Sequence, residues 1–276
     1  MNVLSLFDGI SCAQIALNRA KIQYNNYYAS EINKHAISIT QRNYKNTIQL
    51  GDVKKIHKGI LPKIDILIGG SPCQGFSQSG KRLGFEDERS SLFFEYYRLL
   101  KELKPKYFIL ENVKMKKETK KTISGMLKVD PILINSNLVS AQNRPRLYWT
   151  NIKNIQHPKN KNIYLSDILQ CNTDKKYNLD INKLDNKFIE TYKDKKNMTF
   201  TERRTKEGKE LRKLYRLKYG KDYTPRRAKE LTHRKDNKSN CLTATFSKKE
   251  HIVIDNNAVF RKLTPIEFER LQTIPD

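Results

Sequence analysis

The sequence predicts an α/β protein with a parallel sheet covered by helices on both faces, joined to a smaller, irregular and strongly basic domain. Short apolar runs alternate with helix-like segments through the first half of the chain, which is typical of a parallel sheet. Polar turns that contain glycine or acidic residues follow these runs directly. The stretch 151–257 is rich in lysine and asparagine and has little periodicity, which indicates a second region of different character.

Each strand of the predicted sheet is a short apolar segment, as expected for a strand buried on both faces. The expected strands are residues 3–7, 27–30, 48–50, 64–68 and 107–110. Helices are expected where apolar residues recur at helical spacing, namely from about Cys12, at 35–43 and at 92–103. A few short strands are also expected near residues 242–254, where β-branched residues return.

The chain has 276 residues, with 54 Lys and Arg against 29 Asp and Glu, giving a formal charge of +25. This charge favours a polyanionic partner, either nucleic acid or an anionic membrane surface, although a lysine-rich surface from an AT-rich genome is an alternative. Residues 193–238 hold 18 basic and 7 acidic residues with interleaved tyrosines. That stretch is a candidate nucleic-acid surface, and a solvated helical face with loops is its alternative.

No run of about 18 apolar residues is present, so no membrane span is predicted, and the first residues lack a secretory signal pattern. The four cysteines are Cys12, Cys73, Cys171 and Cys241. They are far apart, which argues against both a zinc site and a disulfide framework and fits a cytoplasmic protein without a bound metal.

Cys73 differs from the other cysteines because it follows a strand in a loop rich in Gly, Pro and Ser, at residues 69–77. Such a loop exposes the sulfur and surrounds it with backbone N–H groups, which can favour the nucleophilic thiolate. Glu111 ends the next strand, so both groups would face one cavity. A partly buried carboxyl tends to keep its proton, which makes Glu111 a candidate acid.

Ligands of an open parallel sheet bind beyond the carboxyl ends of its strands. Three further strand ends carry suitable residues, namely Phe7-Asp8-Gly9, Glu31 and Gly51-Asp52. A carboxylate at Glu31 could accept hydrogen bonds from ribose hydroxyls, and Asp52 could accept one from an exocyclic amine. The set indicates a nucleoside pocket, although acidic residues are common at strand ends.

Together, the motifs of this sequence resemble those of the cytosine-C5-specific DNA methyltransferases of bacterial and phage type. The matching motifs lie in order from residue 3 to residue 276 and include residues 3–9, Ser71-Pro72-Cys73-Gln74-Gly75-Phe76-Ser77, Glu111-Asn112-Val113, Gln142-Asn143-Arg144-Pro145-Arg146 and Arg261-Lys262-Leu263-Thr264-Pro265. The resemblance implies a Rossmann-like S-adenosylmethionine-dependent methyltransferase fold. It also implies a catalytic and cofactor-binding domain at 1–153, a target recognition domain at 154–258, and a return segment at 259–276.

The resemblance further implies a covalent mechanism on double-stranded DNA, with the target cytosine flipped out of the helix. Cys73 would attack carbon 6 of the base, and carbon 5 would then take a methyl group from S-adenosylmethionine. Glu111 would bind ring nitrogen 3, and Arg144 and Arg146 would orient the base and Glu111. For the cofactor, the resemblance implies contacts from Phe7, Gly9, Glu31, Asp52, Pro72 and Leu92.

The sequence departs from the family pattern in two places. Ser11-Cys12 stands where many members have a second glycine, which we expect to be a minor change. The family also continues past Pro275-Asp276 with a short segment that closes the cofactor pocket. We therefore expect a second polypeptide to supply that segment, or a truncated chain. The alternatives are an inactive or split chain that binds DNA, and a tRNA cytosine-C5 methyltransferase.

Overall fold

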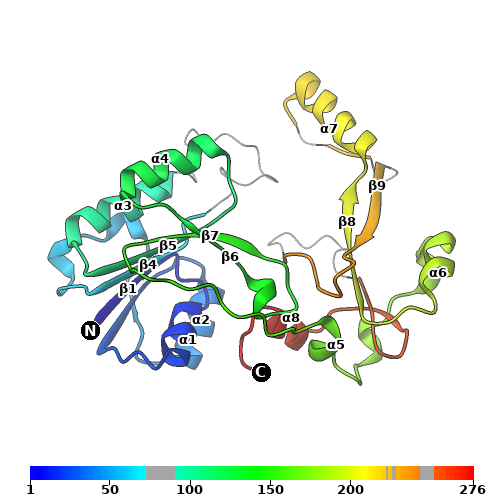
Figure 1. The fold of residues 1–276 in the computed structure, drawn as a ribbon, viewed down its shortest axis with the longest axis horizontal. Helices are drawn as coiled ribbons and strands as arrows, with labels where there is room; N and C mark the ends of the chain where they lie inside the picture. The colour runs from blue at the N-terminus through cyan, green and yellow to red at the C-terminus, as the bar shows by residue number, and fades with distance from the viewer. Residues whose placement is uncertain (73–90, 222, 226–227, 243–251) are drawn as a thin grey trace. The chain divides into compact units, whose positions relative to one another are not determined.

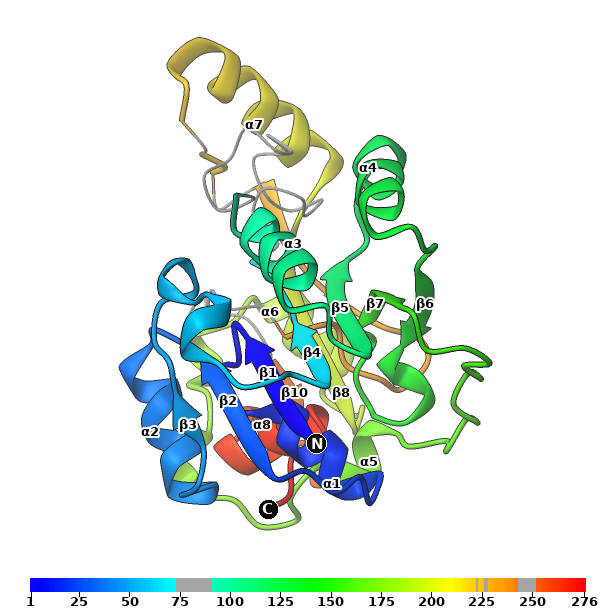
Figure 2. The ribbon, with the colours of Figure 1, turned by 90° about the vertical axis from the view of Figure 1, so that its left-hand side faces the viewer.

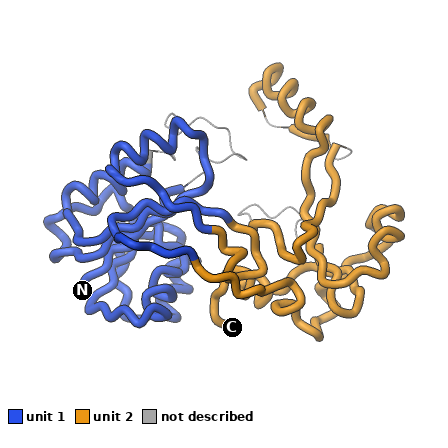
Figure 3. Tube along the Cα trace, viewed as in Figure 1, with its two compact units in different colours: residues 1–134, 145–157 blue, residues 135–144, 158–276 orange. Residues whose placement is uncertain are grey.

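In the computed structural model, the residues described are 1–72, 91–221, 223–225, 228–242 and 252–276. Cys73 and the rest of its predicted loop therefore lie outside the described residues. The chain divides into two compact units, shown in separate colours in Figure 3. Unit 1 contains residues 1–134 and 145–157, and unit 2 contains residues 135–144 and 158–276. Residues 259–276, the expected return segment, are grouped with unit 2.

Unit 1 is built on a seven-stranded sheet with the order β3-β2-β1-β4-β5-β7-β6 (Figure 2). Its strands are β1 (Asn2–Leu6), β2 (Asn26–Ser30), β3 (Ile48–Gln49), β4 (Ile66–Gly69), β5 (Tyr107–Val113), β6 (Ile132–Asn135) and β7 (Pro145–Thr150). Strands β1 to β5 pair in parallel, as the sequence predicts, whereas β7 runs antiparallel to β5. The order places β1 in the middle, between β2 and β4.

Alternate residues of β1 enter two separate cores, which confirms that both faces of the sheet are covered. Val3 packs in a cluster with Leu17 of helix α1 (Cys12–Arg19). Leu4 and Leu6 pack in the larger cluster of the opposite face. That cluster draws its helical side chains from α3 (Ser91–Leu103) and α4 (Lys117–Leu127), while helix α2 (Lys34–Asn43) follows β2.

Unit 2 contains a four-stranded antiparallel sheet with the order β11-β10-β8-β9. Its strands are β8 (Met198–Arg204), β9 (Lys229–His233), β10 (Ile252–Ile254) and β11 (Phe260–Lys262). Its helices are α5 (Leu165–Ile168), α6 (Asn186–Tyr192), α7 (Lys206–Tyr219) and α8 (Pro265–Leu271). Figure 1 shows α7 inserted in the connection between β8 and β9.

This region is more regular than its sequence indicates. Phe200 of β8 is fully buried and packs with Phe188 of α6 and Ile252 of β10, in a core whose members lie far apart in the chain. The basic helix α7 begins at the N-cap Thr205 and ends at Gly220, which has a left-handed φ of 65°. Most of its residues are long and charged, so they give little hydrophobic periodicity.

Arg261, Asp255 and Glu267 form a buried ionic cluster in the C-terminal part of unit 2. The side chain of Glu267 in α8 is fully buried and accepts two hydrogen bonds from Arg261, at 2.7 and 2.8 Å. Arg261 also donates to Asp255 at 2.9 Å. Glu267 forms a capping box with Thr264, and its carboxylate accepts the backbone N–H of Gln170 at 2.8 Å. The cluster thus joins β11, α8 and the segment after α5.

Candidate functional site

The carboxyl ends of five adjacent strands carry the predicted site residues of unit 1. Following the sheet order from β3 to β5, these are Asp52, Glu31, Phe7 with Gly9, Pro72 and Glu111. Because β1 to β5 are parallel, these residues share one edge of the sheet. The edge includes the point between β1 and β4 where the strand order changes direction, which is where open α/β sheets bind ligands.

The turn after β1 is tied to the end of β2 by backbone and side-chain hydrogen bonds. The N–H of Asp8 donates to the carbonyl of Ser30 at 3.1 Å, and the N–H of Gly9 donates to Oε2 of Glu31 at 2.8 Å. Gly9 has a φ of +60°, which glycine adopts without strain, and no atom of the described residues lies within 4 Å of where a Cβ would be. The turn therefore leaves open space next to the Glu31 carboxylate.

The other oxygen of Glu31 is fixed by its own chain. Oε1 accepts the N–H groups of Ile32 and Asn33, both at 2.8 Å. Asn33 is the N-cap of α2, so the carboxylate is held where a helix begins. Each carboxylate oxygen can accept two hydrogen bonds, so Oε1 is fully used and Oε2, which accepts the N–H of Gly9, can accept one more from a ligand.

Asp52, Phe7 and Leu92 are further predicted cofactor-binding residues of unit 1. Asp52 accepts the N–H of Lys54 at 3.0 Å, and Ser30 Oγ donates to the carbonyl of Gly51 at 2.8 Å. These bonds tie the loop after β3 to β2. Phe7 and Leu92 are partly buried, and both pack against the large core cluster. Unit 1 thus contains the carboxylates of Glu31 and Asp52 together with the apolar side chains of Phe7 and Leu92.

Asp8 is a buried residue of the same turn, which the sequence analysis included in the strand end Phe7-Asp8-Gly9 without giving it a role. It accepts hydrogen bonds from the hydroxyls of Tyr27, at 2.7 Å, and Ser11. Burial raises the pKa of Asp8 above its usual value, and the nearby charge of Glu31 raises it further, whereas the hydroxyl hydrogen bonds lower it. Asp8 lies beneath the turn as its anchor, with 9% of its surface exposed.

Glu111 and Arg146, two of the predicted catalytic residues, form an ion pair. Arg146 Nε lies 2.7 Å from Glu111 Oε1, and the side chains are 13% and 31% exposed, respectively. Gly70 follows β4 beside them, and a Cβ there would lie 3.0 Å from Glu111 Oε2. Glycine at this position thus lets the Glu111 carboxylate lie directly against the chain that leads to Cys73.

Asn112 fixes the start of the loop that contains Cys73. Its side-chain amide donates to the carbonyl oxygen and the hydroxyl of Ser71, at 3.3 and 3.2 Å, and only 1% of Asn112 is exposed. The sequence analysis quoted Asn112 within a motif but gave it no role. An amide at the end of a buried strand, where an apolar residue is expected, was the available signal.

Arg144, the fourth predicted catalytic residue, belongs to unit 2, and the structure describes it with partners from that unit. Its Nη1 lies 3.6 Å from the sulfur of Cys241, and its N–H donates to Oδ1 of Asn135 at 2.9 Å. Residues 239–241 run beside residues 141–144. Asn143 N–H donates to the carbonyl of Ser239 at 2.9 Å, and Ser239 N–H donates to that of Ala141 at 2.7 Å.

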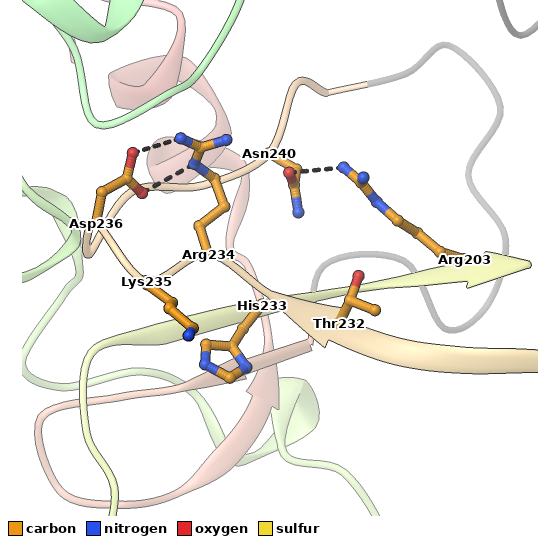
Figure 4. Close-up of a pocket in the computed structure, with 7 residues that line it drawn as sticks. All are labelled: Arg203, Thr232, His233, Arg234, Lys235, Asp236 and Asn240. Carbon is orange, nitrogen blue, oxygen red and sulfur yellow. Dashed lines mark hydrogen bonds and ion pairs between the residues drawn. The ribbon is translucent and has the colours of Figure 1, made fainter. Parts of the chain in front are cut away.

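Unit 2 also contains a cavity of about 390 Å³ between the end of β9, the loop after it and β8 (Figure 4). It is lined by Arg203, Thr232, His233, Arg234, Lys235, Asp236 and Asn240. Arg234 and Asp236 are paired through two hydrogen bonds. Arg203 donates to Asn240 Oδ1 at 2.8 Å. The sequence predicts a basic surface here but does not identify this pocket.

Two absences hold for the part of the chain that the structure describes. Within it, His, Cys, Asp and Glu side chains form no group of three or more that could hold a metal ion. Within the same residues, no helix combines the length and apolarity needed to cross a membrane.

Comparison with known proteins identifies the family. The family model described as C-5 cytosine-specific DNA methylase matches residues 1–276. The orphan methyltransferase M.SPRI of Bacillus phage SPR is 40% identical over 166 residues, which cover 55% of this chain and 38% of that protein. The type II methyltransferase M1.ScrFI of Lactococcus lactis subsp. cremoris is 32% identical over 297 residues, covering 99% of this chain and 69% of that protein.

The fold agrees with this assignment. The solved structure of an Entamoeba histolytica methyltransferase, EhMeth, has a TM-score of 0.65 at 21% identity and covers 100% of this chain and 86% of that one. The chain spans only about two fifths of the length of the phage relative. The match over all 276 residues establishes the ancestry, and this chain belongs to the C-5 cytosine-specific DNA methylase family.

Proposed function

We propose that the chain transfers a methyl group from S-adenosylmethionine to carbon 5 of cytosine in double-stranded DNA. Family membership supports the reaction class. The observation that carries the assignment of residues is the Glu111–Arg146 ion pair, which lies at the end of β5 beside Gly70, three positions before Cys73. It sets a carboxyl group of fixed orientation at the start of the loop that bears the proposed nucleophile.

The residues present at the strand ends fit S-adenosylmethionine. The open turn at Gly9 and the oriented carboxylate of Glu31 suit the ribose of a nucleoside, and Asp52 would accept a hydrogen bond from the adenine amine. Phe7, Pro72 and Leu92 would supply apolar contacts. When bound, the cofactor supplies an electrophilic methyl group.

Cytosine is a poor nucleophile at carbon 5, so the chain must activate it first. In the proposed reaction, the Cys73 thiolate adds to carbon 6, and Glu111 gives a proton to ring nitrogen 3, which neutralises the negative charge that develops on the ring. Carbon 5 then takes the methyl group, which leaves S-adenosylhomocysteine. Loss of the carbon-5 proton to water, return of the nitrogen-3 proton to Glu111 and expulsion of the thiolate restore the aromatic ring and free Cys73. Arg146 holds Glu111, and Arg144 orients the base.

DNA is the proposed partner, and residues 154–258 are the proposed target recognition domain. The 18 basic residues of 193–238 provide charge for contacts with phosphates. A base inside a duplex is closed to attack at carbon 6, so the cytosine must be flipped out. The proposed catalytic and recognition domains correspond in outline to units 1 and 2, with their limits still a prediction.

The test is bisulfite sequencing of plasmid DNA from cells that express the chain. Wild type is expected to protect cytosines within one short sequence, and Cys73→Ser is expected to protect none. The matched control is Cys171→Ser, which removes an exposed thiol from unit 2 and should leave the pattern unchanged. Methylation by Cys73→Ser at the wild-type rate would refute Cys73 as the nucleophile.

A further inference from the structure

We propose that the cavity beside β8 and β9 is a recognition site for the major-groove edge of a guanine, with Arg203 as the residue that reads the base. This inference rests on the proposed function, because it takes DNA as the ligand. It goes further by assigning the base and the residue. Every residue of the site belongs to unit 2.

Two consecutive hydrogen bonds connect the Arg203 side chain to Thr201 through Asn240. Its Nη2 donates to Oδ1 of Asn240 at 2.8 Å, and Asn240 Nδ2 donates to Thr201 Oγ1 at 2.9 Å. Asn240 is only 7% exposed, and Thr201 lies two residues before Arg203 in β8. The buried amide therefore uses both its ends to hold the guanidinium. Figure 4 shows Asn240 between Arg203 and Arg234.

Most of the Arg203 guanidinium stays available to a ligand, as far as the described residues show. The residue is exposed, and its bond to Asn240 uses one of the five guanidinium N–H groups. The remaining donors form a planar fork, the geometry that pairs with O6 and N7 of guanine in the major groove. A fixed fork loses little conformational entropy when it binds, so it can discriminate between bases as well as attract DNA.

The surrounding charges favour a base edge over a phosphate. Arg234 is neutralised by its pair of hydrogen bonds to Asp236. Glu230 lies directly opposite Arg203 in the β8–β9 ladder, so its carboxylate belongs to the same face of the sheet. A site built mainly to attract phosphate would concentrate unopposed cations, whereas here acidic residues accompany the arginines and hydrogen-bond geometry remains the main selective feature.

The experiment selects bound duplexes from a random-sequence DNA library with the purified full chain and reads the enriched bases. Wild type should select guanine at a defined position. Arg203→Gln should reduce the guanine preference at that position by roughly 5- to 150-fold and leave the other positions unchanged. Asn240→Ala keeps the arginine but removes its support, so it should weaken the same preference while leaving the salt dependence of binding as in wild type.

The matched control is Lys196→Gln, which removes one positive charge from an exposed residue of the same unit and should change no position. The inference is overturned if wild type selects no guanine or if Arg203→Gln leaves the preference intact. It is also overturned if Arg203→Gln weakens all sequences equally and lowers the salt slope by about one, which is the behaviour of a phosphate contact. Should Asn240→Ala fail to fold, Arg203→Gln decides alone.

Selection measures binding, so it separates this inference from the proposed reaction. A chain that selects guanine through Arg203 but methylates no cytosine in the bisulfite assay would contradict the proposed function and retain the recognition site. A chain that methylates cytosine but shows no role for Arg203 in sequence choice would contradict the recognition site and retain the proposed function.

Discussion

The buried carboxylate of Glu267 provides the sharpest test of what stabilises unit 2. Glu267→Gln keeps the shape of the side chain but replaces one acceptor oxygen with an NH₂ group. In the native structure Oε2 accepts Arg261 Nη1 and the N–H of Thr264, at 2.8 and 2.9 Å, while Oε1 accepts Arg261 Nη2 and the N–H of Gln170. Either orientation of the amide therefore leaves two buried donors facing a third donor.

The magnitude follows from those two lost acceptors. Each buried donor left without a partner costs about 1–3 kcal/mol, and breaking a buried ion pair on one side costs about 3–5 kcal/mol. The two estimates overlap, and we expect the free energy of unfolding of unit 2 to fall by about 3–5 kcal/mol. That is a large part of the total of about 5–15 kcal/mol for a typical domain.

Urea unfolding followed by circular dichroism measures this loss. The matched control is Asp276→Asn, which removes the partner of Arg270, also on α8, where the two side chains are 51% and 33% exposed. Solvent screens an exposed pair of this kind, so the control should unfold close to wild type. Equal, small effects of Glu267→Gln and Asp276→Asn would refute the reasoning.

Three further predictions concern unit 1 and DNA. The pKa of Asp8 is raised on folding, so folded chain binds more protons than unfolded chain, and the free energy of unfolding should fall as pH rises from about 4 through the raised pKa. Asp8→Asn should flatten this part of the pH profile in urea unfolding. Glu31→Gln should weaken S-adenosylmethionine binding in calorimetry by about tenfold or more, since a charged acceptor is replaced by a neutral one, and equal affinity would contradict the ribose role. The affinity for DNA should fall steeply with salt, with a log–log slope of about −0.9 per phosphate contacted, and a flat dependence would count against the basic surface.

The first five strands could be predicted from sequence because each is a local signal. Residues 3–7 and 64–68 are apolar runs with polar or glycine residues directly after them, and the structure places strands at Asn2–Leu6 and Ile66–Gly69. Parallel pairing then brings Glu31 and Glu111 to one edge without any knowledge of side-chain contacts. Strand β7 was not among the expected strands, and its antiparallel direction had no local signal, because the residues of a strand do not specify its direction relative to a neighbour.

Unit 2 could not be predicted in the same way because its structure depends on distant pairings. Phe200 of β8 pairs in register with Ile252 of β10, some fifty residues later, and with His233 of β9. The pocket likewise depends on Arg203 meeting Asn240, and neither residue is distinctive alone. Helix α7 could have been predicted, because Thr205 and Gly220 are typical cap residues. Its many charged residues give little hydrophobic periodicity, and the sequence analysis did not assign a helix there.

Residues 239–241 join the two arginines of unit 2 to which roles are assigned above. Asn240 accepts a hydrogen bond from Arg203, Ser239 bonds through its backbone to Ala141 and Asn143, and the sulfur of Cys241 lies 3.6 Å from Nη1 of Arg144. Because one peptide bond connects Asn240 to Cys241, a displacement of the amide would move the sulfur as well. If Arg203 reads a base as proposed, the choice of sequence and the position of Arg144 would therefore be coupled through three consecutive residues.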